Sequence, residues 1–278
     1  MDGASLRAMI VVATDPDGLD AASQRVVGLG ARPVTISAPA RGRRVLLAAV
    51  DDVWREDAAI RALRADGWVA VARPDDGIRL DAWRRHTRPI EVGERLTISF
   101  AWSEHDRCAA PGLVELGLGG FGNGDHPATR LLLDALVRRV APGDRVLDVG
   151  CGSGVLGLAA LRLGAGSLVA MDIKPAAVEA TRRNAELNGL GGLVTATDAP
   201  PADLDGPFGV IVANVGRAVA VDLAADLRRL LAPGGWLAVS GFSPPQCSSV
   251  AGALAPLIEA ERRTNGDWAA MIATRAPC

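Results

Sequence analysis

The sequence predicts an α/β protein in which a doubly wound, mostly parallel sheet of seven strands follows a smaller N-terminal α+β domain. From residue 126 onward, short apolar runs of β type alternate with helical patterns, and this alternation is typical of a parallel sheet with helices on both faces. The end of the chain breaks the pattern with two β-rich runs around Asn265 and Gly266, which is a strong signal for an antiparallel hairpin.

The first 74 residues have a pattern of their own, which predicts a ferredoxin-like domain. Its apolar runs and helical spacings follow the order β-α-β-β-α-β, the split pattern typical of that fold. The expected elements are a strand at 8–14, a helix at 17–29, the strands "PVTIS" and "RRVLLAAV", a helix at 53–65 and the strand "WVAVARP".

Residues 75–125 are expected to form a connector with structure of its own. "DAWRRHTRP" predicts a short helix that Pro89 ends, because proline cannot continue a helix. "IEVGERLTISF" predicts a hairpin that turns at Gly93, and "GLVELGLGGFGNGDHP" predicts a strand that runs into a glycine-rich loop. Long irregular segments within compact proteins are usually functional or disordered, and the apolar residues beside these glycines favour function.

The third expected domain covers 126–278 and contains the parallel sheet. The helix expected at 175–189 begins with proline and ends with glycine, as helices prefer. The predicted helices are 128–140, 155–165, 175–189, 217–235 and 246–258, and the predicted strands are 144–150, 167–172, 193–198, 208–214, 236–242 and two within 259–275.

Composition excludes several classes of protein. The 278 residues are 49% hydrophobic and carry a net charge of −2, so no broad electrostatic contact with nucleic acid is expected. The chain has no long apolar run, which argues against a membrane span. Its four cysteines form no C-x-x-C pair, so we expect no metal site and no disulfide framework, and a reducing cytoplasm is the simplest location.

The segment "VLDVGCGSGVLG" at 146–157 predicts a ligand-binding loop between a strand and a helix. Glycine lets the backbone approach a ligand and adopt positive φ. Two spacings fit: Gly150, Gly152 and Gly154 as one set, or Gly152, Gly154 and Gly157 as the dinucleotide pattern G-x-G-x-x-G. The antiparallel hairpin at the chain end is unusual for a dinucleotide fold. We expect Asp148, Gly150, Gly152 and Gly154 to bind a cofactor, a simple turn being the alternative.

Polar side chains end the next three predicted strands. Ligands of open α/β sheets bind at the carboxyl ends of the strands. Asp172 is placed to accept hydrogen bonds from ribose hydroxyls, as either S-adenosylmethionine or a nicotinamide cofactor would need, although aspartate is also a good helix cap. Asp198 could accept the adenine amino group or could be a turn residue, and Asn214 faces the same crevice.

Taken together, these motifs resemble the class I S-adenosylmethionine-dependent methyltransferases, and among them the family that methylates ribosomal protein L11. The resemblance covers roughly residues 81–275. It rests on "WRRHTRPIEVGERLTI", "GFGNGDHPATR", "LDVGCGSGVLGLAALRLGA", "DIKPAAVEATRRNAELNG", "VIVAN" and "LAPGGWLAVSGF". It implies the class I methyltransferase fold, S-adenosyl-L-methionine as cofactor and a substrate-recognition role for the N-terminal domain.

The resemblance also assigns roles to residues. It implies cofactor contacts at Thr129, Gly150, Asp172 and Asn214, with Asp198 on the adenine side. We expect Asn214 to act as an orienting acceptor for the substrate amine. Asp125 and His126 are further catalytic candidates as proton acceptors; alternatively, Asp125 holds an ammonium and His126 is a structural residue at a helix start.

The same resemblance predicts an N-methyltransferase that acts on amino groups of a protein. The family loop usually reads F-G-T-G-T-H-P-T-T, whereas this chain has F-G-N-G-D-H-P-A-T, and Arg217 stands near the expected substrate entrance. These differences leave a small-molecule amine or acid as an alternative substrate. From other classes, an NAD(P)-dependent oxidoreductase and a non-catalytic cofactor-binding module also fit the glycine loop.

Overall fold

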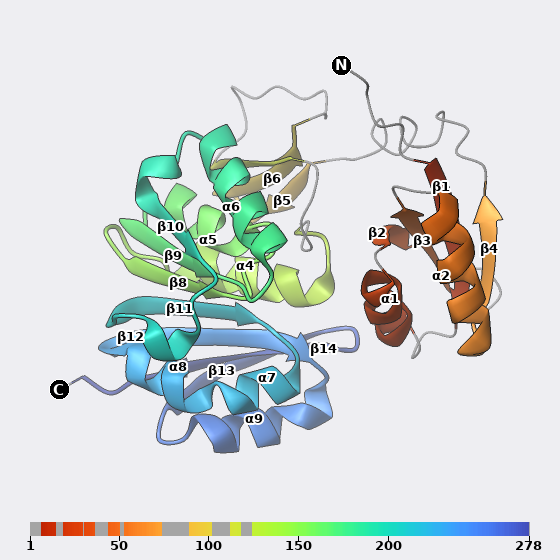
Figure 1. Ribbon diagram of the computed structural model, residues 1–278. Helices are drawn as coiled ribbons and strands as arrows, with labels where there is room; N and C mark the ends of the chain where they lie inside the picture. The colour runs from red at the N-terminus through yellow and green to blue at the C-terminus, as the bar shows by residue number, and fades with distance from the viewer. Residues whose placement is uncertain are drawn as a thin grey trace. The chain divides into compact units, whose positions relative to one another are not determined.

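The computed structural model describes residues 7–14, 19–29, 31–36, 44–50, 53–73, 89–101, 112–117 and 124–277. The chain divides into two compact units, residues 1–86 and residues 87–278 (Figure 1). The strands of the expected connector that the structure describes belong to the second unit.

The first unit is a four-stranded antiparallel sheet with two helices on one face. Its strand order is β2-β3-β1-β4. Leu46, Ala48 and Ala70 of the sheet share one core with apolar residues of both helices. The elements are β1 (Arg7–Thr14), α1 (Leu19–Gly28), β2 (Arg32–Ile36), β3 (Arg44–Val50), α2 (Val53–Ala65) and β4 (Val69–Arg73).

The second unit is built around a seven-stranded sheet of order β10-β9-β8-β11-β12-β14-β13. Neighbouring strands from β10 to β12 pair in parallel, whereas β14 is antiparallel to both β12 and β13. The predicted α/β fold with a mostly parallel sheet and a terminal hairpin is therefore confirmed. The strands are β8 (Arg145–Val149), β9 (Ser167–Met171), β10 (Val194–Thr197), β11 (Phe208–Asn214), β12 (Leu231–Phe242), β13 (Ile258–Asn265) and β14 (Trp268–Thr274).

Helices cover both faces of this sheet (Figure 1). Successive strand residues point to opposite faces, so Val146 packs in the core beneath one helical layer and Leu147 in the core beneath the other. One layer holds α4 (Pro127–Arg139), α5 (Val155–Arg162) and α6 (Pro175–Leu187), and the other holds α7 (Arg217–Asp222), α8 (Ala224–Leu230) and α9 (Cys247–Leu254).

A second, three-stranded sheet packs on the outer side of the α4–α6 layer. It consists of β5 (Ile90–Val92), β6 (Leu96–Phe100) and β7 (Leu113–Leu116). Strands β5 and β6 form the predicted hairpin, with Gly93 at φ 56° in its turn. Apolar residues of all three strands share one core with α4 and α5, so this sheet is part of the second unit.

Two helix predictions were wrong in their extent. The helix expected over 217–235 is two helices that break at Leu223, and Leu231 already begins β12. Proline and glycine explain the early end, because Pro233 lacks an amide hydrogen and Gly234 has φ 74°. The break at Leu223 involves no helix-breaking residue. The other helix, expected over 246–258, ends at Leu254 ahead of Pro256. The helix predicted from "DAWRRHTRP" lies outside the described residues.

No helix in the described part of the chain is long and apolar enough to cross a membrane.

An ion-pair network joins α4 to the terminal hairpin. Glu261 of β13 accepts hydrogen bonds from Arg138 at 3.0 Å and Arg139 at 2.8 Å, in the last turn of α4, and from Arg263 of its own strand. These bonds, led by the one from Arg139, lower the pKa of Glu261 from 4.5 to about 2. The network therefore holds the terminal hairpin against α4, whose first turn lies near the carboxyl end of β11.

We expect Glu261→Gln to lower the free energy of unfolding by ~0.5–2 kcal/mol at neutral pH, because three charge-assisted bonds lose their anion. A depressed pKa contributes stability above the unfolded value that is lost on acidification. The difference from wild type should therefore shrink as pH falls from 4.5 toward 2. Chemical denaturation across this range measures it, and Glu259→Gln, which removes a more exposed pair with Arg262, is the control. An equal loss in both variants would contradict the prediction.

Candidate functional site

The candidate site lies at the carboxyl ends of β8, β9 and β11. Strand β8 lies between β9 and β11, so the chain leaves it toward β9 and later returns on its other side to form β11. Crevices of open α/β sheets form at such points, where the strand order reverses. The loop after β8 and the residues after β9 and β11 therefore meet at one edge.

The loop from Gly150 to Gly154 is held by its own backbone and by β9. Its glycines have φ values of 72°, 55° and 81° at Gly150, Gly152 and Gly154, a region that side chains disfavour. The amides of Gly150 and Cys151 both donate to the Met171 carbonyl, at 2.8 and 3.0 Å. The loop therefore needs glycine for its conformation as well as for access by a ligand.

Asp148 is buried beneath this loop, with 1% of its surface exposed. Its Oδ2 accepts the amide of Gly157 in α5 at 3.0 Å, while its Oδ1 meets no hydrogen-bond donor among the described residues. Burial raises the pKa of Asp148 to about 7; the bond from Gly157 opposes this shift and the charge of Asp172 adds to it. Asp148 thus supports the turn into α5 from below.

Asp172 joins the loop to the start of α6. Its Oδ2 accepts the Gly152 amide at 3.1 Å and its Oδ1 accepts the Lys174 amide at 2.9 Å. Lys174 is the N-cap residue of α6, so Asp172 bonds the helix start without being its N-cap. Each carboxylate oxygen can accept a further bond, and the side chain is partly exposed, so it retains capacity for ligand hydroxyls.

Ile173, directly after Asp172, was missed by the sequence reasoning. This residue is 81% exposed and lies at the same carboxyl end of β9 as Asp172. An apolar residue that follows a strand-terminal acid was the available signal.

Asn214, at the end of β11, contacts α4. Its Nδ2 donates to the hydroxyl of Thr129 at 3.0 Å, and Thr129 is 2% exposed. Two predicted site residues 85 positions apart are therefore brought together, and their bond orients the amide of Asn214.

His126 has a structural role at the start of α4. It is the N-cap residue, and its Nδ1 accepts the Ala128 amide at 3.3 Å. Its ring also lies edge-on to Trp268, with centroids 4.6 Å apart. Asp125 precedes it and is exposed. The structural alternative for His126 is therefore the one that these contacts favour.

Asp198 directly follows β10 and is exposed. Because β10 pairs in parallel with β9, Asp198 lies at the same edge as Asp172. The edge thus carries the carboxyl groups of both Asp172 and Asp198. The described residues contain no cluster of His, Cys, Asp and Glu that could hold a metal ion.

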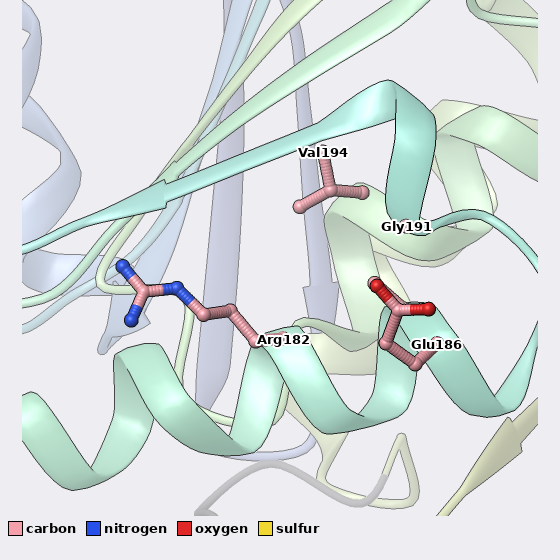
Figure 2. A pocket seen from close by; sticks show the side chains of 5 residues that line it. Arg182, Glu186, Gly191 and Val194 are labelled. Atoms are coloured by element: carbon pink, nitrogen blue, oxygen red, sulfur yellow. The ribbon is translucent and has the colours of Figure 1, made fainter.

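A separate hollow of about 180 Å³ lies beside α6, lined by Arg182, Ala185, Glu186, Gly191 and Val194 (Figure 2). Val194 is the first residue of β10, so this hollow lies at the amino end of that strand. The candidate site lies at the carboxyl ends, and the hollow is not part of it.

The comparison with known families shows the family to which the chain belongs. A family model described as ribosomal protein L11 methyltransferase (PrmA) matches residues 69–276. The chain belongs to this family. The ribosomal protein L11 methyltransferase of Gloeobacter violaceus is 41% identical over 226 residues, which cover 79% of this chain and 69% of that protein. The one from Bordetella bronchiseptica is 43% identical over 204 residues, covering 69% and 64%.

A solved structure agrees with the sequence relatives. The ribosomal protein L11 methylase from Lactobacillus delbrueckii subsp. bulgaricus has a TM-score of 0.63 and 30% sequence identity, covering 68% of this chain and 100% of that one. The predicted resemblance to the L11 methyltransferase family is thereby confirmed.

Membership of the family makes the chain a methyltransferase enzyme whose methyl donor is S-adenosylmethionine. The cofactor of this family is therefore S-adenosylmethionine, and not the nicotinamide that was the alternative. The residues present fit S-adenosylmethionine: Gly150 and Gly152 are the partly exposed positions of the glycine loop, Asp172 offers acceptors for hydroxyls, and Asp148 keeps a buried carboxylate oxygen without a donor among the described residues.

We expect the stability contribution of Asp148 to depend on pH. The folded chain keeps this proton up to about pH 7, while the unfolded carboxyl loses it near 3.8. A raised pKa stabilises at low pH, and that contribution is lost as pH rises through the folded value. From about pH 5 to pH 8, the free energy of unfolding of wild type should fall relative to Asp148→Asn by roughly 2–3 kcal/mol. Denaturant titrations measure this, with Asp203→Asn at an exposed acid as control. A pH-independent difference would refute it.

Proposed function

We propose that the chain transfers methyl groups from S-adenosylmethionine to amino groups of a ribosomal protein of the L11 type, in the cytoplasm. The observation that carries the proposal is the family match over residues 69–276, since relatives with this match are named for that substrate. The bonds that unite Asp172, the glycine loop, Asn214 and Thr129 at one sheet edge support a site of this kind.

The architecture of the N-terminal unit supports the proposal that the substrate is a macromolecule. Its β-α-β-β-α-β order and its strand order β2-β3-β1-β4 are those of a ferredoxin-like domain. We assign substrate recognition to this domain over 1–74 and the cofactor-binding methyltransferase domain to 126–278, with 75–125 as a connector whose strands β5, β6 and β7 share the core of that domain.

We assign the cofactor contacts along the sheet edge. Asp172 accepts the ribose hydroxyls, Asp198 accepts the adenine amino group, and exposed Ile173 packs against the adenine ring. The glycine loop and the Asn214–Thr129 pair face the methionine part. The full set is Thr129, Asp148, Gly150, Gly152, Gly154, Asp172, Asp198 and Asn214, with Asp148 acting from beneath the loop.

S-adenosylmethionine, when bound, supplies a methyl group already activated by its sulfonium centre. The work left to the chain is to align the amine, which can contribute up to ~7–11 kcal/mol, and to favour its neutral form. A lysine amine with a pKa of ~10.4 is neutral about once in a thousand at pH 7.4, a cost of ~4 kcal/mol, whereas an α-amine costs under ~1 kcal/mol.

Asn214 is the strongest catalytic candidate. Its Nδ2 is engaged by Thr129, so its Oδ1 is the atom left to accept a hydrogen bond from the substrate amine and direct the lone pair. Asp125, exposed beside the helix start, is the candidate to receive the proton. His126 already uses Nδ1 to accept an amide, which places the proton of the neutral ring on Nε2 and weakens its case as a base.

We expect Asp172→Ala to raise the dissociation constant for S-adenosylhomocysteine at least tenfold, about 1.4 kcal/mol. The variant removes both the proposed ribose acceptor and the bond that holds the Gly152 amide. Isothermal titration calorimetry measures the constant. Asp198→Ala, at an exposed acid of the same edge, is the matched control and should change it less than Asp172→Ala. An unchanged constant in Asp172→Ala would overturn the ribose assignment.

The substrate is tested by intact-mass analysis of purified ribosomal protein L11 from the same genome, incubated with the enzyme and S-adenosylmethionine. We expect a series of +14 Da steps, one for each methyl group. Gly152→Arg, which puts a side chain at φ 55° in the loop, should abolish the series. If wild type gives no series although it binds the cofactor, the L11 assignment fails, and small amines become the substrates to test, with Arg217 as a partner for an acidic group.

A further inference from the structure

Helix α6 turns a stripe of polar side chains inward. Thr181, Asn184 and Asn188 are 0%, 3% and 8% exposed and share one face of the helix. Burying a carboxamide without hydrogen bonds is costly, so each of these side chains has specific partners. The stripe lies between the glycine loop on one side and strand β7 on the other.

Asn184 contacts both sides. Its Nδ2 donates to the carbonyl of Ser153, in the glycine loop, at 2.8 Å. Its Oδ1 accepts the amide of Gly117, directly after β7, at 2.8 Å. The two bonds have opposite polarity, so together they define which end of the amide faces which partner.

The other two members of the stripe each contact one side. Thr181 donates its hydroxyl to the Gly152 carbonyl or to the Cys151 sulfur, both at 3.2 Å. Asn188 bonds the backbone of Glu115 in β7 twice, accepting its amide at 2.8 Å and donating to its carbonyl at 2.7 Å. Of these three side chains, Asn184 is the one that bonds both the glycine loop and the end of β7.

The position of Gly117 in the chain gives this bridge a functional meaning. The segment after Gly117 leads in sequence to Asp125, His126 and Thr129, which the proposed function places among the catalytic candidates and the cofactor contacts. A bond that fixes the Gly117 amide therefore fixes the end of β7 from which this segment starts.

We propose that Asn184 is a positioning residue for methyl transfer, which couples the cofactor-binding loop at Ser153 to the end of β7 at Gly117. Cofactor on the glycine loop immobilises the Ser153 carbonyl, this holds the Asn184 amide, and the amide in turn holds the Gly117 N–H. The inference rests on the proposed function, since it takes this loop as the cofactor loop.

The chain offers a closely matched pair of variants. Asn184→Asp keeps the shape of the side chain and an acceptor for the Gly117 amide, but it turns an oxygen toward the Ser153 carbonyl. Asn188→Asp makes the same change four residues along the same helix, where it turns an oxygen toward the carbonyls of Glu115 and Asn184. The second variant disturbs β7 without touching the glycine loop.

Hydrogen exchange of the full chain, with and without saturating S-adenosylhomocysteine, tests the coupling. In wild type and in Asn188→Asp, we expect the ligand to slow exchange of the Gly117 amide at least fivefold. In Asn184→Asp, it should still slow exchange in the glycine loop but change the Gly117 rate less than twofold. Asn184→Ala, which loses both bonds, should give the same uncoupling if Asn184→Asp does not fold.

Acidification provides a rescue that a purely structural role does not predict. Once protonated, the carboxyl introduced by Asn184→Asp can donate to the Ser153 carbonyl and restore the link. The ligand-induced protection of Gly117 in this variant should therefore return at about pH 5 and be absent at about pH 8. Wild type measured at both pH values accounts for the acids on neighbouring elements, Asp148, Asp172 and Glu115, which are present in both proteins.

Different results would contradict the proposed cofactor site and the proposed coupling through Asn184. If the ligand does not protect the glycine loop of wild type, the proposed cofactor site is wrong. If it protects the loop but not Gly117, or if Asn184→Asp keeps the protection of Gly117 at both pH values, the coupling through Asn184 is wrong. Steady-state assays with the L11 substrate give a second readout. The coupling predicts that Asn184→Asp raises the KM for this substrate by a larger factor than it raises the dissociation constant for S-adenosylhomocysteine. Asn188→Asp should not show this difference.

Discussion

The carboxylate of Asp172 is the contact on which the functional edge of this protein depends. It accepts the amides of Gly152 and Lys174, and so joins the loop after β8 to the helix after β9. The three left-handed glycines of this loop have no side chains to hold them, so much of the loop's shape comes from bonds between its backbone and neighbouring elements. Asp172 supplies one of these bonds, and the Met171 carbonyl supplies two more. We propose that the same carboxylate also receives the sugar of the cofactor.

Buried polar side chains on neighbouring elements hold further parts of the site in place. Asp148 supports the loop from below, Thr181 and Asn184 hold its carbonyls from the side of α6, and Asn214 bonds Thr129 across the sheet edge. Buried polar groups require partners in fixed places, so these bonds specify one arrangement more strictly than apolar packing would. The site is therefore built from backbone atoms that side chains of neighbouring elements hold in place, which suits a reaction governed by alignment.

Much of the fold and of the candidate site could be predicted from the sequence, because the patterns that indicate them are local. The alternation of strands and helices, the Asn265-Gly266 turn and the polar residues at strand ends each depend on a few consecutive residues, and the structure has them where expected. What local patterns cannot show is which side chains meet. The bond between Asn214 and Thr129, the double role of Asp172 and the bridge of Asn184 all join segments far apart in the chain. The break at Leu223 likewise has no local signal, since no residue there strongly disfavours helix.

The account is tested most directly by a crystal structure of the chain with S-adenosylhomocysteine. It predicts the ribose hydroxyls within hydrogen-bond distance of the Asp172 carboxylate, the Gly152 amide still bonded to that carboxylate, and the adenine on the side of Ile173 and Asp198. A nucleoside bound elsewhere, or bound at this edge with its sugar away from Asp172, would contradict the central claim.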